Sequence, residues 1–404
     1  MERPHRPRPR RAGFTLVELL VAILIIATLL ALLLPTIGAA FKNAKQATVT
    51  TEMNNLATAL ASFRTQFGDF PPSRIILPEG GFKAVSPSGS GYAGASSSSS
   101  DISDTLLVQR SLTYLRKFWP RVNFNDPTAA PNNTAQKFFD FNGNGTNDGT
   151  LIINGSQCLT FFLGGIPILG PLDQTTKKYP ILGVSGFSKS PVNPFINAAG
   201  ATNRTAPNYE FVVGRLIDND GNGIPSYLDP LDLSPGNRRA YAYFSAYGVN
   251  GYDPNDVNYL ERQDITLVPQ YEREDDPTDP TSSDTILVER GFLVSFPVLA
   301  SGSTTAATYA VSSAPNPYTS GAPGATPVAW QNPNSYQILC AGADRQWGLG
   351  GTYIANAASG SSLPVSTSDP ALTHKFDADD ASPKSSVRLR EADNLTNFSS
   401  SRLQ

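Results

Sequence analysis

The chain has 404 residues, with 31 lysines and arginines against 34 aspartates and glutamates, so its formal net charge is −3. Residues 2–13 hold five arginines and one glutamate, and without them 26 basic and 33 acidic residues leave a net charge of −7. The chain after this leader has no basic patch with interleaved aromatic side chains, so nucleic acid is not expected as a partner. Its two cysteines do not make a disulfide scaffold.

An apolar block at residues 14–34 follows the arginine-rich leader. As a helix it would be about 31 Å long, close to the thickness of the hydrocarbon core of a bilayer. The positive-inside rule keeps the leader in the cytoplasm and exports the chain that follows. An ordinary secretory signal, cleaved near Gly38-Ala39-Ala40, and a plain signal anchor are two interpretations of this block. Neither explains Glu18, because an acidic side chain inside a membrane helix is costly and usually marks function.

The stretch GFTLVE, which begins at Gly13, resembles the signal of type IV pilins and type II secretion pseudopilins. The resemblance implies that a prepilin peptidase cuts after Gly13 and methylates the new amine of Phe14. It also implies that Glu18 pairs with the terminal amine of a neighbouring pilin or pseudopilin subunit during filament assembly. Pro35 stands where many members of the family carry a helix-bending proline.

On this interpretation residues 1–13 are a prepilin leader peptide and residues 14–67 form one N-terminal helix. Its first part, 14–34, is expected to cross the inner membrane once, with the head exported to the periplasm or cell surface. Its second part, 35–67, is amphipathic, and Gly68 should end it. The apolar stripe recurs at spacings of three and four and consists of Val49, Met53, Leu56, Leu60, Phe63 and Phe67.

The rest of the chain, 69–404, predicts a β-rich globular head. The expected fold class is α+β, with a pilin-like long N-terminal helix, its first half transmembrane, packed on an antiparallel β-sheet head with long loop insertions. Low-complexity 86–101 and polar 355–392 are such insertions, and 110–122 is expected to be a short amphipathic helix. Short apolar runs between turn-rich stretches predict strands in 150–154, 157–168, 208–218, 240–248, 284–300 and 334–342.

The two cysteines, Cys158 and Cys340, lie in apolar runs of the head. In an exported chain they could form one disulfide, or they could be two separately buried thiols. Pilin disulfides usually close a short loop late in the chain. The spacing here differs from that pattern, which favours free thiols.

One loop has the oxygen spacing of an EF-hand-type calcium site. DNDGNGIPSYLD (218–229) places acidic and amide side chains at alternate positions, a glycine at the sharp turn and an aspartate at position twelve. The alternative is an Asx-rich turn without metal. If the loop binds Ca²⁺, the ion is structural and the candidate ligands are Asp218, Asp220, Asn222, the Ile224 carbonyl, Ser226 and Asp229.

A second loop, DFNGNGTNDGTL (140–151), repeats this pattern with fewer charges. Its twelfth residue is Leu151, so a turn is as good an interpretation as a metal site. The candidate ligands are Asp140, Asn142, Asn144 and Asp148.

The end of the chain offers a third pair of candidates through a resemblance. YQILCAGADRQWGLGG (336–351) and READNLTNFS (390–399) resemble the calcium-holding loop and closing turn of major pseudopilins. The resemblance implies Asp344 and Asp393 as calcium ligands. This chain departs from the family pattern in its long intervening segment and in Arg345, which stands where the family has glycine.

Two further stretches, LGG at 163–165 and GFSKSPVNPF at 186–195, resemble large prepilin-like proteins of planctomycetes. No catalytic constellation stands out, since the chain after the leader has one histidine, His374, and no CxxC, HExxH or phosphate-loop motif. We therefore expect a structural pilin or pseudopilin subunit and not an enzyme. The alternative is a membrane-tethered calcium-binding surface or adhesion module that never enters a filament.

Overall fold

The structure is a computed structural model. It describes residues 16–84, 102–127, 137–173, 179–196, 203–218, 221–231, 233–234, 238–246, 251–252, 271–275, 285–289, 292–296, 307–311, 317–320, 329–345, 347, 351–355, 357, 362–363, 391–399 and 402–403. The low-complexity segment 86–101 lies entirely outside these residues, and so does most of 355–392. The chain divides into two compact units, Met1–Ala47 and Thr48–Gln404.

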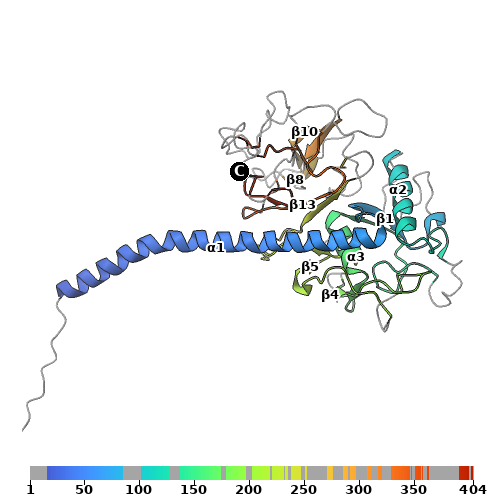
Figure 1. Cartoon of the computed structure of the whole chain (residues 1–404), viewed down its shortest axis with the longest axis horizontal. Helices are drawn as coiled ribbons and strands as arrows, with labels where there is room; N and C mark the ends of the chain where they lie inside the picture. The colour runs from blue at the N-terminus through green and yellow to red at the C-terminus, as the bar shows by residue number, and fades with distance from the viewer. Residues whose placement is uncertain are drawn as a thin grey trace, which may run out of the picture. The chain divides into compact units, whose positions relative to one another are not determined.

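Helix α1, Leu16–Phe67, is continuous (Figure 1). In the first unit its large apolar side chains from Leu16 to Leu30 are each 46–78% exposed. In the part of the chain that the structure describes, no helix meets the requirements of length and hydropathy for a membrane span. The helix ends where the sequence predicts, because Gly68 adopts a positive φ of 82° and donates its N–H to the Arg64 carbonyl at 2.7 Å.

In the second unit, α1 contributes its apolar stripe to the main hydrophobic core. The first five members of the predicted stripe are at most 3% exposed, and Phe67 is half-buried against them. Phe63 contacts Phe118 of α2 (Ile102–Phe118) and Phe162 of α3 (Gly155–Gly164), both edge to face. The prediction of a buried stripe is therefore confirmed, and the predicted amphipathic helix at 110–122 is the second half of α2.

Helix α3 corrects a sequence prediction. Residues 157–168 are mostly apolar and read as a strand, but Gly155–Gly164 is a helix whose residues are all buried. A helix surrounded by core on all sides has no polar face, so its hydrophobic pattern loses the helical period. It follows directly after β2 (Thr150–Asn154), which forms as predicted.

The strands of the described residues form several small sheets where one sheet was expected. β1 (Arg74–Pro78) pairs antiparallel with β2, and the largest sheet has three strands in the order β15-β13-β7. These are Leu395–Thr396, Tyr336–Cys340 and Ala242–Ser245, so the predicted runs 240–248 and 334–342 each contain a strand.

The other sheets are two-stranded. β3 (Pro167–Leu169) pairs with β4 (Ile181–Val184), and β5 (Leu216–Ile217) with β6 (Ser226–Tyr227), so run 208–218 is strand only at its end. The run 284–300 splits into β9 (Thr285–Glu289) and β10 (Phe292–Phe296), which pair with β8 (Tyr271–Asp275) and β11 (Ala307–Val311). One pair is parallel, that of β12 (Tyr318–Thr319) with β14 (Gly351–Thr352). Two short 3₁₀ turns, η1 (Phe82–Ala84) and η3 (Val213–Arg215), are also described.

Two glycine stretches noted in the sequence meet in space. Gly165 forms a parallel bridge with Gly186, and the Gly186 N–H donates to the Gly164 carbonyl at 2.7 Å. A Cβ on Gly165 would lie 2.3 Å from the Gly186 backbone, so only glycine fits this approach. The two cysteines, on α3 and β13, are both buried free thiols, which confirms the thiol interpretation.

Candidate functional site

A largely buried carboxylate on α1, that of Glu52, gathers polar side chains from the rest of the second unit. Glu52 accepts hydrogen bonds from both terminal nitrogens of Arg215, at 2.7 and 2.6 Å. It also accepts hydroxyl donors from Tyr227 and Tyr241, both at 2.7 Å, and from Tyr209 at 3.3 Å. This group of five residues, the Glu52 cluster, ties α1 to residues more than 150 positions later in the chain.

The cluster is electrostatically compensated. Burial by itself would raise the pKa of Glu52, but hydrogen bonds from Arg215 and two tyrosines lower it below its ordinary value of 4.5. Arg215 also donates to the Leu228 carbonyl and lies 4.3 Å from the centre of the Tyr227 ring. Sequence reasoning missed Glu52. The signal was available, because Glu52 directly precedes Met53 and falls on the apolar face of the helix.

The loop 140–148 is arranged as an oxygen-rich turn. Asp140 Oδ2 accepts the Gly145 N–H at 3.1 Å, and Asn142 Oδ1 accepts the Asn144 N–H at 3.1 Å. The amide nitrogens of Asn142 and Asn144 both donate to Asp148 Oδ2, at 2.8 and 2.5 Å. The structure therefore brings all four predicted ligands of this loop together.

A carboxylate from outside the loop joins this group. Glu79 directly follows β1, and its Oε2 accepts the Asp148 N–H at 2.5 Å. Glu79 and Asp140 are both fully buried, and Glu79 Oε1 and Asp140 Oδ1 have no hydrogen-bond partner. Burial, reinforced by the neighbouring carboxylates, raises the pKa of Glu79 to about 8, and burial raises that of Asp140 to about 6.

The loop 218–229 is only partly available as a metal site. Asp218 accepts the N–H groups of Gly221 and Gly223 at 2.9 and 3.0 Å. Asp220 lies outside the described residues. The Ile224 carbonyl accepts the Gln157 amide at 3.0 Å, and Ser226 is the first residue of β6. The two loops also touch, since Asn142 donates to the Asn222 carbonyl at 2.9 Å.

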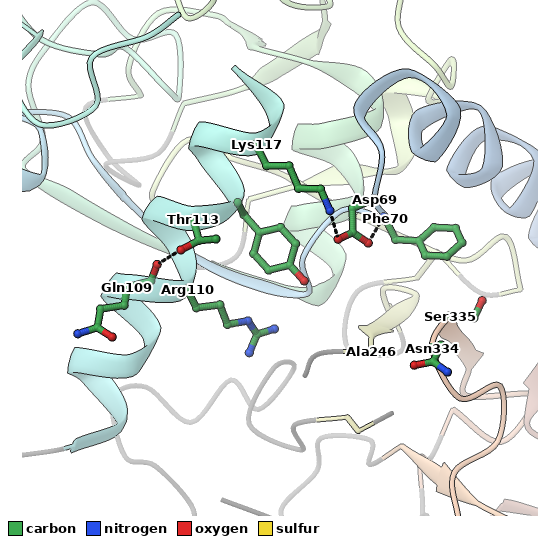
Figure 2. Close-up of a pocket in the computed structure, with 10 residues that line it drawn as sticks. Asp69, Phe70, Gln109, Arg110, Thr113, Lys117, Ala246, Asn334 and Ser335 are labelled. Carbon is green, nitrogen blue, oxygen red and sulfur yellow. Dashed lines mark hydrogen bonds and ion pairs between the residues drawn. The ribbon is translucent and has the colours of Figure 1, made fainter. Parts of the chain in front are cut away.

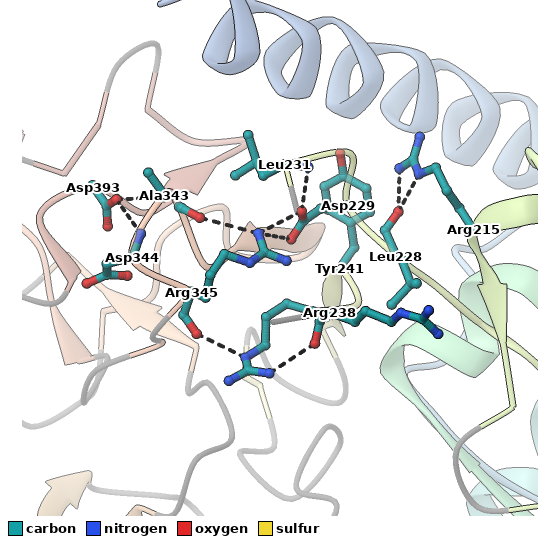
Figure 3. Close-up of polar contacts among 12 residues, drawn as sticks. Arg215, Leu228, Asp229, Leu231, Arg238, Tyr241, Ala343, Asp344, Arg345 and Asp393 are labelled. Carbon is teal, nitrogen blue, oxygen red and sulfur yellow. Dashed lines mark hydrogen bonds and ion pairs between the residues drawn. The ribbon is translucent and has the colours of Figure 1, made fainter. Parts of the chain in front are cut away.

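The predicted closing ligand of that loop, Asp229, is engaged by an arginine (Figure 3). Arg345 Nη1 donates to both carboxylate oxygens of Asp229, at 2.7 and 2.9 Å, and both side chains are buried. Arg345 has a positive φ of 66°, a conformation that glycine adopts more readily than arginine. Its guanidinium compensates the buried negative charge of Asp229.

The C-terminal candidates are adjacent in the structure. Asp393 Oδ2 accepts the backbone N–H groups of Ala343 and Asp344, at 2.6 and 3.1 Å (Figure 3). The Asp393 carboxylate therefore closes the turn after β13. Within the described residues no group of three or more His, Cys, Asp and Glu side chains is already arranged to hold a metal ion.

A cavity of about 480 Å³ lies between the loop after α1, helix α2 and the start of β13 (Figure 2). Its charged pair is satisfied, because Lys117 donates to Asp69 at 2.6 Å and the other Asp69 oxygen accepts the Phe70 N–H. The lining residues are Asp69, Phe70, Gln109, Arg110, Thr113, Tyr114, Lys117, Ala246, Asn334 and Ser335.

The N-terminal candidates are described in part. Gly13 and Phe14 lie outside the described residues, while Glu18 is in the first turn of α1. An acidic side chain there complements the positive end of the helix dipole. Pro35 lies within α1, and the bend that the sequence predicts there stays a prediction.

Comparison with known families identifies this N-terminal segment. Residues 8–34 match the family described as the prokaryotic N-terminal methylation motif. The chain therefore carries a type IV pilin-like prepilin signal, whose processing is the task of a prepilin peptidase. No curated protein and no solved structure shows significant similarity to the chain.

Proposed function

We propose that this chain is a structural subunit of a type IV pilus or a type II secretion pseudopilus. Prepilin peptidase would remove residues 1–13 and methylate Phe14. The mature subunit would then hold its head in the periplasm or at the cell surface, anchored by residues 14–34 in the inner membrane. This role is structural and not enzymatic.

The observation that carries this proposal is the continuity of α1. The matched signal ends inside a helix that runs on, without a break, into the core of the second unit. Its apolar side chains from Leu16 to Leu30 are exposed, and a long row of such side chains in water is unfavourable. Lipid, and then the same segment of neighbouring subunits, would cover them.

Glu18 is the residue through which we propose that assembly occurs. A carboxylate in a lipid environment is expensive unless a cation neutralises it. The terminal amine of Phe14 in an adjacent subunit would supply that cation, since its ordinary pKa is about 8. This ion pair would therefore stabilise the assembled subunit relative to the isolated one.

We also propose that calcium stabilises the exported head. The support is the gathering of carboxylate and amide oxygens around loop 140–148. Hard oxygen ligands of this kind suit Ca²⁺, and modules outside the cell bind it at about 10⁻⁴–10⁻³ M. Binding to the folded state alone would raise the stability of the head after export.

The test of the filament role has two parts. Mass analysis of the mature chain should find N-methyl-Phe14 as its first residue. Glu18→Ala should be cleaved and inserted normally but should be depleted from sheared or cross-linked filaments. Thr28→Ala is the matched control, because the Thr28 hydroxyl bonds to the Ile25 carbonyl of its own helix.

Three results would contradict this proposal in different ways. A mature chain that begins near Phe41 would indicate an ordinary secretory signal. Normal filament incorporation of Glu18→Ala would remove assembly as the role of this residue. A correctly processed chain that stays outside every filament would indicate a membrane-tethered surface module.

A further inference from the structure

The pairing of β1 with β2 places a distant acid beside the loop 140–148. The antiparallel register ends at Pro78 opposite Thr150, so Glu79 comes next to Gly149. The Glu79 N–H donates to the Gly149 carbonyl at 2.8 Å, and the Glu79 carbonyl accepts the Phe139 N–H at 2.9 Å. Hydrogen bonds to the two ends of the loop, at Phe139 and Gly149, therefore hold the backbone of Glu79 in place.

Among the described residues, no positive charge is paired with the oxygens that meet there. Glu79 Oε1 and Asp140 Oδ1 are fully buried without a hydrogen-bond partner. None of the ion pairs among the described residues involves Glu79, Asp140 or Asp148. Buried carboxylates are normally paired or bound to a metal, because an uncompensated buried charge is strongly unfavourable.

The loop is already turned as a cation loop requires. The hydrogen bond from Gly145 occupies one oxygen of Asp140, and the other oxygen is buried without a hydrogen-bond partner. Two amide groups, those of Asn142 and Asn144, point their N–H donors at the same oxygen of Asp148. A half-turn of either amide would present its oxygen to a cation beside Asp148.

We propose that Glu79 and the loop 140–148 together form a calcium site. The ligands would be the carboxylates of Glu79, Asp140 and Asp148 and the amide oxygens of Asn142 and Asn144. As the described residues stand, these three carboxylates do not form a group that could hold a metal ion, so they would have to close around the ion on binding. Glu79 takes the part of the closing acid that the loop itself lacks, because Leu151 occupies position twelve and is buried in the core. This inference rests on the calcium role proposed for the head, and it assigns that role to a specific site.

The ligand chemistry favours Ca²⁺ over Mg²⁺. Five oxygen-bearing side chains from two segments give many ligands in an irregular arrangement. Ca²⁺ accepts six to eight such oxygens with flexible geometry, whereas Mg²⁺ demands a near-ideal octahedron and retains its water. Mg²⁺ is accordingly the matched control ion.

The experiment uses the full-length chain purified in detergent and stripped of metal with chelator. Isothermal titration with CaCl₂ measures binding, and the thermal unfolding midpoint is recorded with CaCl₂, with MgCl₂ and with chelator. The variants are Glu79→Gln and Asp140→Asn, which preserve shape while removing one charge each. Asp69→Asn is the control, because Asp69 is in a part-exposed ion pair with Lys117.

We expect wild type and Asp69→Asn to bind Ca²⁺ and to unfold at a higher temperature with it. Both site variants should bind more weakly, on the order of tenfold or more, because fewer ligand charges remain. In chelator, however, Glu79→Gln should unfold at or above the wild-type midpoint, since it removes a buried carboxyl group that has no cation beside it. A merely structural carboxylate would give the opposite result in chelator.

Two outcomes would overturn the site. Unchanged calcium affinity in both variants, with binding lost in Asp393→Asn, would place the ion at the C-terminal turn and leave a calcium-stabilised head intact. No calcium binding by wild type would refute both the site and the calcium role. Neither result bears on processing after Gly13 or on assembly through Glu18. If Glu79→Gln fails to fold, as circular dichroism in chelator would show, Asp140→Asn decides alone.

Discussion

Glu52 and Arg215 form a two-point ion pair, with oxygen–nitrogen distances of 2.7 and 2.6 Å, although 163 residues separate them in the chain. Glu52 lies on α1 between the buried stripe residues Val49 and Leu56, while Arg215 ends the short turn η3. The pair therefore fixes both the rotation and the axial position of α1 in the second unit. Hydrophobic contacts alone would tolerate a small slide of the helix, but a buried ion pair would not.

Removing either partner should destabilise the second unit strongly. We expect Glu52→Ala to cost about 3–5 kcal/mol of unfolding free energy, because it leaves the buried Arg215 charge without its partner. Chemical denaturation followed by tryptophan fluorescence measures this cost. The matched control is Asn54→Ala, two residues away on the exposed side of the same helix, which should change stability by less than about 0.5 kcal/mol. A loss below 1 kcal/mol for Glu52→Ala would show that the cluster does not hold the helix.

The same carboxylate predicts a pH dependence. The partners of Glu52 lower its pKa in the folded state below 4.5, whereas in the unfolded chain it titrates near the ordinary value. Its contribution to stability is therefore present above the unfolded value and is lost as the pH falls through the folded one. Wild type should lose its advantage over Glu52→Gln on acidification from pH 7 towards 3. A difference that stays constant or grows in acid would contradict the assignment.

Fragment design provides a third prediction. A soluble fragment that begins at Thr48, where the second compact unit starts, should unfold cooperatively. A fragment that begins at Asp69 lacks the buried stripe and Glu52. Each large apolar side chain of the stripe contributes about 1.5–3 kcal/mol on burial. Losing five of them removes about as much stabilisation as the whole free energy of unfolding of a typical domain, about 5–15 kcal/mol. Equal solubility and equal unfolding of both fragments would refute the role of the stripe.

The success and failure of the sequence predictions have physical causes. The stripe of α1 was predictable because one face of the helix meets the core and the pattern keeps its period. The strand at 150–154 was predictable because it is a short apolar run between turn-rich stretches. The strand predicted over 157–168 was wrong because α3 is buried on every side. The sequence of α3 has no one-sided apolar pattern, so its hydrophobic residues do not show a helical period.

The candidate metal site shows the same limit. The residues of loop 140–148 were visible as a spaced motif, but Glu79 was not, because it joins the loop through strand pairing and not through spacing. Asp229 was assigned to the neighbouring loop by spacing alone. In the structure its carboxylate meets Arg345, 116 positions later. Contacts of such separation follow from topology, which a single sequence does not record.

Arg345 supports the last prediction, which separates an ion pair from a metal ligand at Asp229. Arg345→Gly should recover about 1–2 kcal/mol, because Arg345 has a left-handed backbone that glycine adopts without this cost. It also leaves the buried Asp229 carboxylate without its cation, at a cost of about 3–5 kcal/mol. We therefore expect a net loss of stability, measured by chemical denaturation.

Arg345→Gly combined with Asp229→Asn should be more stable than Arg345→Gly alone, since the buried charge is gone. Calcium could restore Arg345→Gly to wild-type stability and leave the double variant unchanged. That result would show that Asp229 is able to bind the ion, and that in the wild type the Arg345 guanidinium takes the position of the calcium ion in loop 218–229.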